Sequence, residues 1–185
     1  MENASKALII AGAILLSILI IALGIYVFNM AKGATNTNSL DELEISQFNQ
    51  LFTTYDGKLM GNNVTSLMDK LVSNASTNKD SDDRLPDLIY IETRTGTSAL
   101  TTANGATGVK VTGATAIPGN DPVLQKITDA GFTGTPTFQI ASDSAATNVA
   151  GFSAFRSKLS PRHYYQVGHI VDDDTGLVSH IIVKY

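Results

Sequence analysis

The 185-residue chain has a net charge of −4 and contains neither cysteine nor tryptophan. The lack of cysteine excludes disulfides, thiolate catalysis and cysteine-ligated zinc. With Glu2, Lys6 and Lys32 set aside, the remainder holds 11 basic and 16 acidic residues, a net charge of −5. An acidic remainder without a basic stripe argues against nucleic acid as a partner.

The most distinctive segment is the apolar run of residues 7–28, which contains no proline and lies in the uncharged stretch between Lys6 and Lys32. As an α-helix its 22 residues reach about 33 Å, enough to cross a hydrocarbon core of about 30 Å. The run is also longer than the apolar part of a signal peptide, which spans about 7–15 residues. We therefore predict that residues 1–31 form a retained hydrophobic helix that lies in lipid or in a bundle of similar helices.

Small residues of this predicted helix gather on two stripes, about 140° apart at 100° per residue. Small side chains let helix backbones approach closely, so two stripes favour contact with two neighbouring helices. The alternative is that alanine and glycine are simply frequent in membrane spans. One stripe comprises Ala4, Ala7, Ala11 and Ala22, and the other comprises Ala13, Ser17 and Gly24. Glu2 and Lys6 have the spacing of a helical ion pair at a membrane surface, or of charges that meet an adjacent subunit.

The polar segment 32–39 predicts a hinge, and residues 40–185 predict one globular domain of ordinary size. Ser39 and Glu42 match a capping box that opens a helix ending near Asp56-Gly57. A second amphipathic helix is predicted after Asn62 or Asn63. We expect the two helices to form an αα-hairpin.

Strands are expected after these helices. The predicted β elements are a strand at 88–91, a hairpin over 97–112 about Asn104-Gly105, a strand at 137–140, and a final hairpin of 163–171 with 177–185. A short helix is expected from Asp121-Pro122 to Ala130, and residues 141–162 read as a surface excursion. The predicted fold class is α+β: a long N-terminal hydrophobic helix, an αα-hairpin and an antiparallel β-sheet domain.

Candidate metal ligands occur in two acidic segments. Asp80 and Asp82 alternate as in a calcium loop, but Asp83 and Ile89 stand where an EF-hand needs glycine and glutamate. Asp172 and Asp174 form a second calcium candidate, although aspartate is also common in turns. We favour solvated acidic loops in both places, and therefore no metal.

Three histidines lie in the last predicted hairpin. Pairing across residues 172–176 favours proximity of His169 and His180, but two histidines without a third ligand are weak evidence for a metal. We favour surface histidines, with His163 as the third. The chain also lacks a nucleophile elbow, a P-loop and a dinucleotide fingerprint, so we predict no enzyme and no cofactor.

The order of elements resembles type IV pilins and pilin-like proteins, which share an N-terminal hydrophobic helix, a helical continuation and a C-terminal sheet. Lys6-Ala7-Leu8-Ile9 is similar to the processing site of archaeal-type prepilins, whereas the usual glutamate at the fifth mature position is missing and Glu2 is a candidate to replace it. The resemblance implies a structural subunit that self-assembles through its helix into a surface filament, with the domain facing outward. The alternatives are a single-pass membrane-anchored structural protein, such as a virion membrane or minor capsid protein, and an anchored ligand-binding module.

Overall fold

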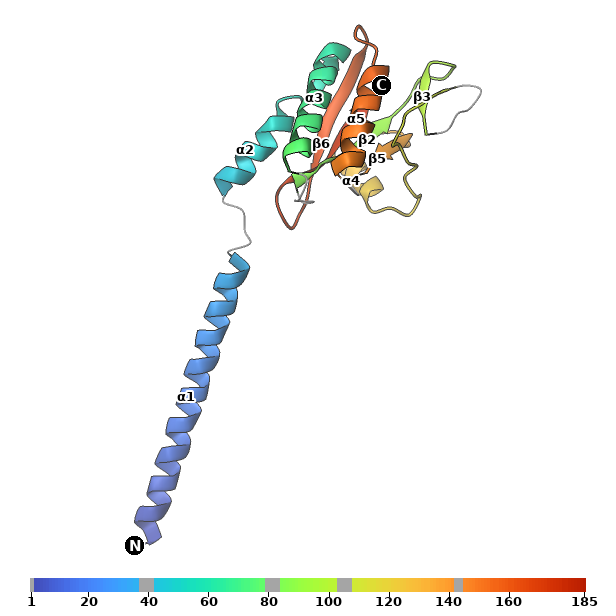
Figure 1. The fold of residues 1–185 in the computed structure, drawn as a ribbon. Coiled ribbons are helices and arrows are strands. Elements are labelled where there is room, and N and C mark those ends of the chain that lie inside the picture. The colour runs from blue at the N-terminus through green and yellow to red at the C-terminus, as the bar shows by residue number, and fades with distance from the viewer. Residues whose placement is uncertain (1, 37–41, 79–83, 103–107, 142–144) are drawn as a thin grey trace. The chain divides into compact units, whose positions relative to one another are not determined.

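The computed structural model describes residues 2–36, 42–78, 84–102, 108–141 and 145–185. The chain divides into two compact units, Met1–Asp41 and Glu42–Tyr185. The first unit contains α1 (Glu2–Asn36), a single helix of 35 residues (Figure 1). The helix continues through residues 32–36, so the predicted hinge at 32–39 begins too early. Residues 37–39, including the predicted N-cap Ser39, lie outside the described residues.

The second unit combines helices with a five-stranded mixed sheet, which confirms the α+β class (Figure 1). Its helices are α2 (Glu42–Thr53), α3 (Gly61–Thr77), α4 (Val123–Asp129) and α5 (Ala145–Lys158). Its strands are β1 (Gly57–Met60), β2 (Asp87–Ile91), β3 (Ala99–Thr101), β4 (Gly108–Lys110), β5 (Phe138–Ile140), β6 (Tyr164–Val171) and β7 (Val178–Lys184).

The main sheet has the strand order β1-β6-β7-β2-β5. The predicted final hairpin is confirmed as β6 and β7, which pair antiparallel. The prediction of a purely antiparallel sheet is wrong, because β2 pairs with β7 in parallel. The hairpin predicted over 97–112 is also wrong: β3 and β4 pair in parallel, and the expected turn at Asn104-Gly105 lies outside the described residues.

A strand separates α2 from α3, so the predicted αα-hairpin is wrong. Gly57, at a φ of 108°, starts β1, which pairs antiparallel with β6. At the start of α3, Gly61 donates its N–H to the carbonyl of His163. A Cβ at Gly61 would lie 2.1 Å from the carbonyl oxygen of Ser160, so only glycine permits this approach. The short β1 therefore becomes an edge of the main sheet.

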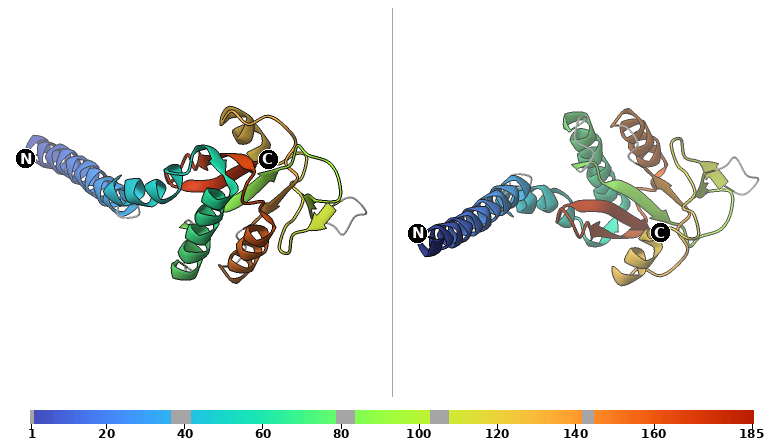
Figure 2. Two further views of the ribbon diagram at one scale, coloured as in Figure 1. Left: turned by 90° about the horizontal axis from the view of Figure 1, so that it is seen from above. Right: turned by 90° about the horizontal axis from the view of Figure 1, so that it is seen from below.

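Helices α3 and α5 lie side by side on one face of the sheet (Figure 2). Under α5, the ring of Phe155 lies 5.1 Å from that of Tyr90 and 5.9 Å from that of Phe138. Phe152 and Phe155 of α5 are almost completely buried. The surface excursion predicted for 141–162 is therefore wrong, because burial of these aromatic rings stabilises a helix whose sequence has little amphipathic periodicity.

Helix α4 covers part of the opposite face (Figure 2). Val123 and Ile127 of α4 pack in one buried cluster with Ile89 and Ile182 of the sheet. After the helix, Gly131 adopts a φ of 83° and the chain turns back over β6. Residues of β1 and of the first half of β6 on this face lie beyond this cover, and they form part of the hollow described below.

Candidate functional site

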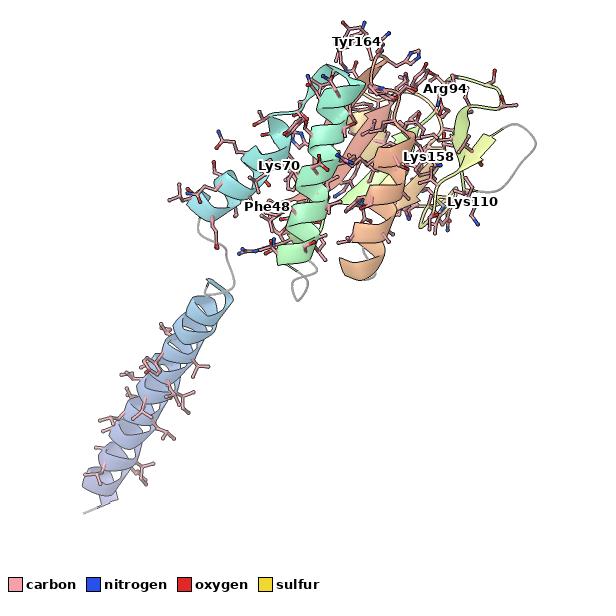
Figure 3. All side chains as sticks on the ribbon, turned by 45° about the horizontal axis from the view of Figure 1, so that its top comes forward. Phe48, Lys70, Arg94, Lys110, Lys158 and Tyr164 are labelled. Atoms are coloured by element: carbon pink, nitrogen blue, oxygen red, sulfur yellow. The ribbon has the colours of Figure 1, made fainter. Side chains whose placement is uncertain are left out.

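The surface of α1 is the first candidate site. Among the described residues, Lys6–Val27 is the one helix long and apolar enough to cross a membrane, and no part of it is buried within the chain. Its large apolar side chains, from Leu8 to Val27, are 56–78% exposed. Side chains project from all sides of the helix (Figure 3). Such a surface requires an apolar environment to cover it.

The predicted assembly residues fall within this helix. Ala7, Ala11 and Ala22 are exposed, as are Ala13 and Gly24 of the other stripe. The hydroxyl of Ser17 donates to the carbonyl of Ala13 at 2.8 Å. Its hydrogen bond is therefore made within its own helix, and the hydroxyl needs no partner on a neighbouring helix. A Cβ built at Gly24 would meet no atom within 4 Å. Lys6 is exposed and stands at the start of the apolar stretch. The side chains of Glu2 and Ala4 lie outside the side chains that the structure describes.

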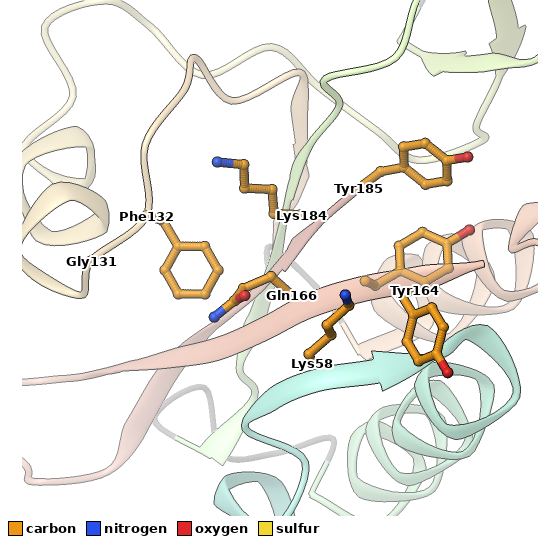
Figure 4. Close-up of a pocket in the computed structure, with 8 residues that line it drawn as sticks. Lys58, Gly131, Phe132, Tyr164, Gln166, Lys184 and Tyr185 are labelled. Carbon is orange, nitrogen blue, oxygen red and sulfur yellow. The ribbon is translucent and has the colours of Figure 1, made fainter.

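The second candidate site is an open hollow of about 360 Å³ on the α4 face of the sheet (Figure 4). Lys58, Gln166 and Lys184 form one row across β1, β6 and β7, because the register pairs Lys58 with Gln166 and Gln166 with Lys184. Paired residues in antiparallel strands lie about 5 Å apart, so the two lysine backbones are separated by about 10 Å. Phe132, Tyr164 and Tyr185 also line the hollow.

Both lysines of the hollow are held in place. Lys58 Nζ lies 4.9 Å from the centre of the Tyr164 ring, within the range of a cation–π contact. Lys184 Nζ donates to the carbonyl oxygen and the hydroxyl of Thr133, at 2.7 and 3.0 Å. Among the described residues that line the hollow, none is acidic. The hollow is therefore a cationic site on a chain whose net charge is negative.

A buried ion pair supports the Tyr185 side of the hollow. Arg94 Nε lies 3.1 Å from the carboxylate of Glu92, whose side chain is 4% exposed. The Arg94 guanidinium also lies 4.3 Å from the centre of the Tyr185 ring. The hydroxyl of Tyr90 donates to Glu92 at 2.7 Å, and burial raises the pKa of Tyr90 well above its ordinary value. These contacts fix the end of β7 against β2.

The acidic turn between β6 and β7 is organised by Asp172. One carboxylate oxygen of Asp172 accepts hydrogen bonds from the backbone N–H groups of Asp174 and Thr175, at 3.1 and 3.0 Å. These bonds, that from Thr175 above all, hold the pKa of Asp172 below its ordinary value. Asp173 pairs with Lys126 of α4 at 3.0 Å, and its own side chain is 85% exposed. The turn thus presents carboxylates on a fixed backbone.

The candidate metal ligands that the structure describes do not converge. His169 lies opposite Ile181 and His180 lies opposite Ile170, so the two histidines point to opposite faces of the sheet and cannot share a metal. His169 Nδ1 instead lies 2.8 Å from the carboxylate of Asp56. Within the described residues, no group of three His, Asp or Glu side chains is placed to hold a metal ion. The calcium candidates Asp80 and Asp82 lie outside the described residues.

No protein-family model, curated protein or solved structure matches the chain.

Sequence reasoning missed the hollow. The available signal was the alternation within β6, where Tyr164 and Gln166 are exposed and the intervening Tyr165 and Val167 are buried. Polar residues in alternation mark an uncovered sheet face. The partners of Gln166 on β1 and β7 lie far from it in sequence, so the pattern alone did not identify them.

Proposed function

We propose that this protein is a non-enzymatic structural subunit that self-assembles through α1 into a pilus-like surface filament. The single observation that carries the proposal is the bare apolar surface of Lys6–Val27. Burying one large apolar side chain contributes about 1.5–3 kcal/mol, so covering this surface provides a large driving force. Copies of the same helix, packed through the two stripes of small residues, would supply that cover.

The dimensions of α1 agree with this role. At 1.5 Å per residue, its 35 residues extend about 53 Å, which exceeds a hydrocarbon core by about 20 Å. A subunit of this kind is held in a membrane before assembly and exposes its Glu42–Tyr185 unit at the cell surface. The resemblance to type IV pilins in the order of elements is a second support for the proposal.

The test is whether purified full-length protein forms particles without detergent. We expect it to sediment in detergent-free buffer and to show a helical repeat by negative-stain microscopy. Ala13→Leu and Gly24→Leu should block assembly by holding helices apart, and Leu16→Ile, which preserves volume, should not. Circular dichroism checks that each variant remains folded. Normal assembly of both bulky variants would show that the stripe of Ala13 and Gly24 is not the packing surface.

The second candidate function is a single-pass membrane anchor for a structural protein. The observation that favours it is Tyr26, an exposed aromatic residue next to the end of the apolar stretch, where membrane proteins place tyrosine at the interface. An anchor requires detergent for extraction and yields micelles without a helical repeat. The same preparation therefore separates the two candidates.

A further inference from the structure

We propose that the acidic turn of one copy, residues 172–174, binds the lysine hollow of the next copy, so that the second units contact head to tail. The inference rests on the proposed self-assembly and adds a specific contact between the outer units. The hollow is defined by Lys58, Gln166 and Lys184, with Tyr164 and Tyr185 beside them.

Charge complementarity supports this occupant. Residues 42–185 include 11 basic and 15 acidic residues, yet the charged residues that line the hollow are both lysines. The amide of Gln166 between them offers donors to the same ligand. The backbones of Lys58 and Lys184 lie about 10 Å apart in this row. A partner with two neighbouring carboxylates matches these two cations. Asp173 and Asp174 are consecutive and exposed, and they form such a partner.

The backbone of the acidic turn, residues 172–174, is already ordered before binding. Asp172 uses its carboxylate to hold the backbone N–H groups of residues 174 and 175, which fixes the backbone at the tip of the turn. Little ordering is then needed when the turn binds, which favours affinity. The pair of Asp173 with Lys126 joins exposed side chains and is worth only about 0.2–1 kcal/mol, so it exchanges readily for a new partner.

The two surfaces lie at opposite ends of one hairpin. Lys58 is paired with Gln166 of β6. Gln166 precedes Asp172 by six residues, a distance of about 20 Å along the strand at about 3.3 Å per residue. A contact between two different patches of the same molecule is heterologous, and it repeats as an open chain when rotation does not close it. Two separate patches of this kind allow copies to join one after another in an open chain.

Disulfide trapping tests the contact in the assembled full-length protein. The chain has no cysteine, so Lys58→Cys with Asp174→Cys introduces the only thiols. The separation within one chain exceeds the Cα distance of about 7 Å that a disulfide allows, so any bond joins two copies. We expect oxidation to give a ladder of dimers, trimers and longer products on a non-reducing gel.

The matched control is Lys70→Cys with Asp174→Cys, because Lys70 is exposed on α3 (Figure 3), which covers the other face of the sheet. It should give no ladder. A ladder of equal strength in the control, or no ladder in material that sediments as filaments, overturns the contact while leaving assembly through α1 intact. A wild-type chain that forms no filament overturns the proposed function, and this inference with it.

Charge reversal gives an independent measurement. Lys58→Glu and Asp174→Lys should each raise the concentration needed for assembly by about tenfold, and the double variant should restore it because every copy then carries the reversed pair. Lys58→Gln should have a smaller effect than Lys58→Glu. Equal loss in the single and double variants would show that the two residues do not meet.

Discussion

The ring of Phe132 occupies the space that a side chain at Gly168 would need: a Cβ at Gly168 would lie 2.5 Å from Cε2 and 2.7 Å from Cζ of Phe132. Glycine at position 168 of β6 thus lets Phe132, in the segment after α4, pack directly against the sheet. Phe132 is 6% exposed in this position, and it separates the buried cluster from the lysine hollow.

Gly168→Ala should therefore lower the free energy of unfolding by about 1–3 kcal/mol, the usual cost of overpacking. The measurement is chemical denaturation of the full-length protein in detergent, followed by tyrosine fluorescence. Gly119→Ala is the control, because a Cβ there meets no atom within 4 Å. An unchanged midpoint for Gly168→Ala would mean that Phe132 moves aside without cost.

Replacing Arg94 tests the buried ion pair. Arg94→Met leaves the carboxylate of Glu92 buried without its cation, and loss of one partner from a buried pair costs about 3–5 kcal/mol. Arg156→Met is the matched control, since its ion pair with Asp69 is exposed on both sides and is worth under about 1 kcal/mol. Similar thermal midpoints for the two variants would contradict a structural role of the Glu92–Arg94 pair.

His180 predicts a pH dependence of stability. Burial lowers the pKa of His180 below its ordinary value of 6.5, although Asp121 and Asp172 attract the proton. The unfolded chain then binds a proton more readily than the folded chain, so this contribution to stability is complete above about pH 6.5 and is lost as the pH falls toward the folded pKa. His180→Gln should flatten the dependence of unfolding free energy on pH between about 7.5 and 5.5. A slope identical to that of the wild type would assign the effect to other groups.

A charge in the centre of α1 should prevent its burial. Leu16 lies at the middle of Lys6–Val27, and a lysine at the centre of a membrane span costs about 2.5–3.5 kcal/mol. Leu16→Lys should thus reduce the fraction of protein that resists carbonate extraction from membranes, and it should abolish sedimentation of filaments. Leu51→Lys makes the same exchange on α2 and should leave both properties unchanged. Equal behaviour of the two variants would argue that α1 is not the buried element.

The elements that local patterns predicted correctly are those whose burial is itself local. Helix α3 repeats Val64, Leu67 and Leu71 at helical spacing, and all three are buried. In the last hairpin, alternation and an aspartate-rich turn predicted β6 and β7. Short β1 and the weakly amphipathic α5 were missed, because their stability comes from β6 and from the Tyr90–Phe138 cluster rather than from their own pattern.

By itself, the sequence determined that residues 7–28 form a helix and need an apolar environment. A run of this length without charge or proline is stable as a helix that lies in lipid or in a bundle. Only the tertiary structure decided that β2 runs parallel to β7, that His169 and His180 face apart, and that Lys58 and Lys184 flank Gln166. The physical reason is that alternation reports which face of a strand is buried, whereas the choice of neighbouring strands depends on packing between distant segments. The lysine row of the proposed contact arises from that choice, whereas the acidic turn is contiguous in the sequence.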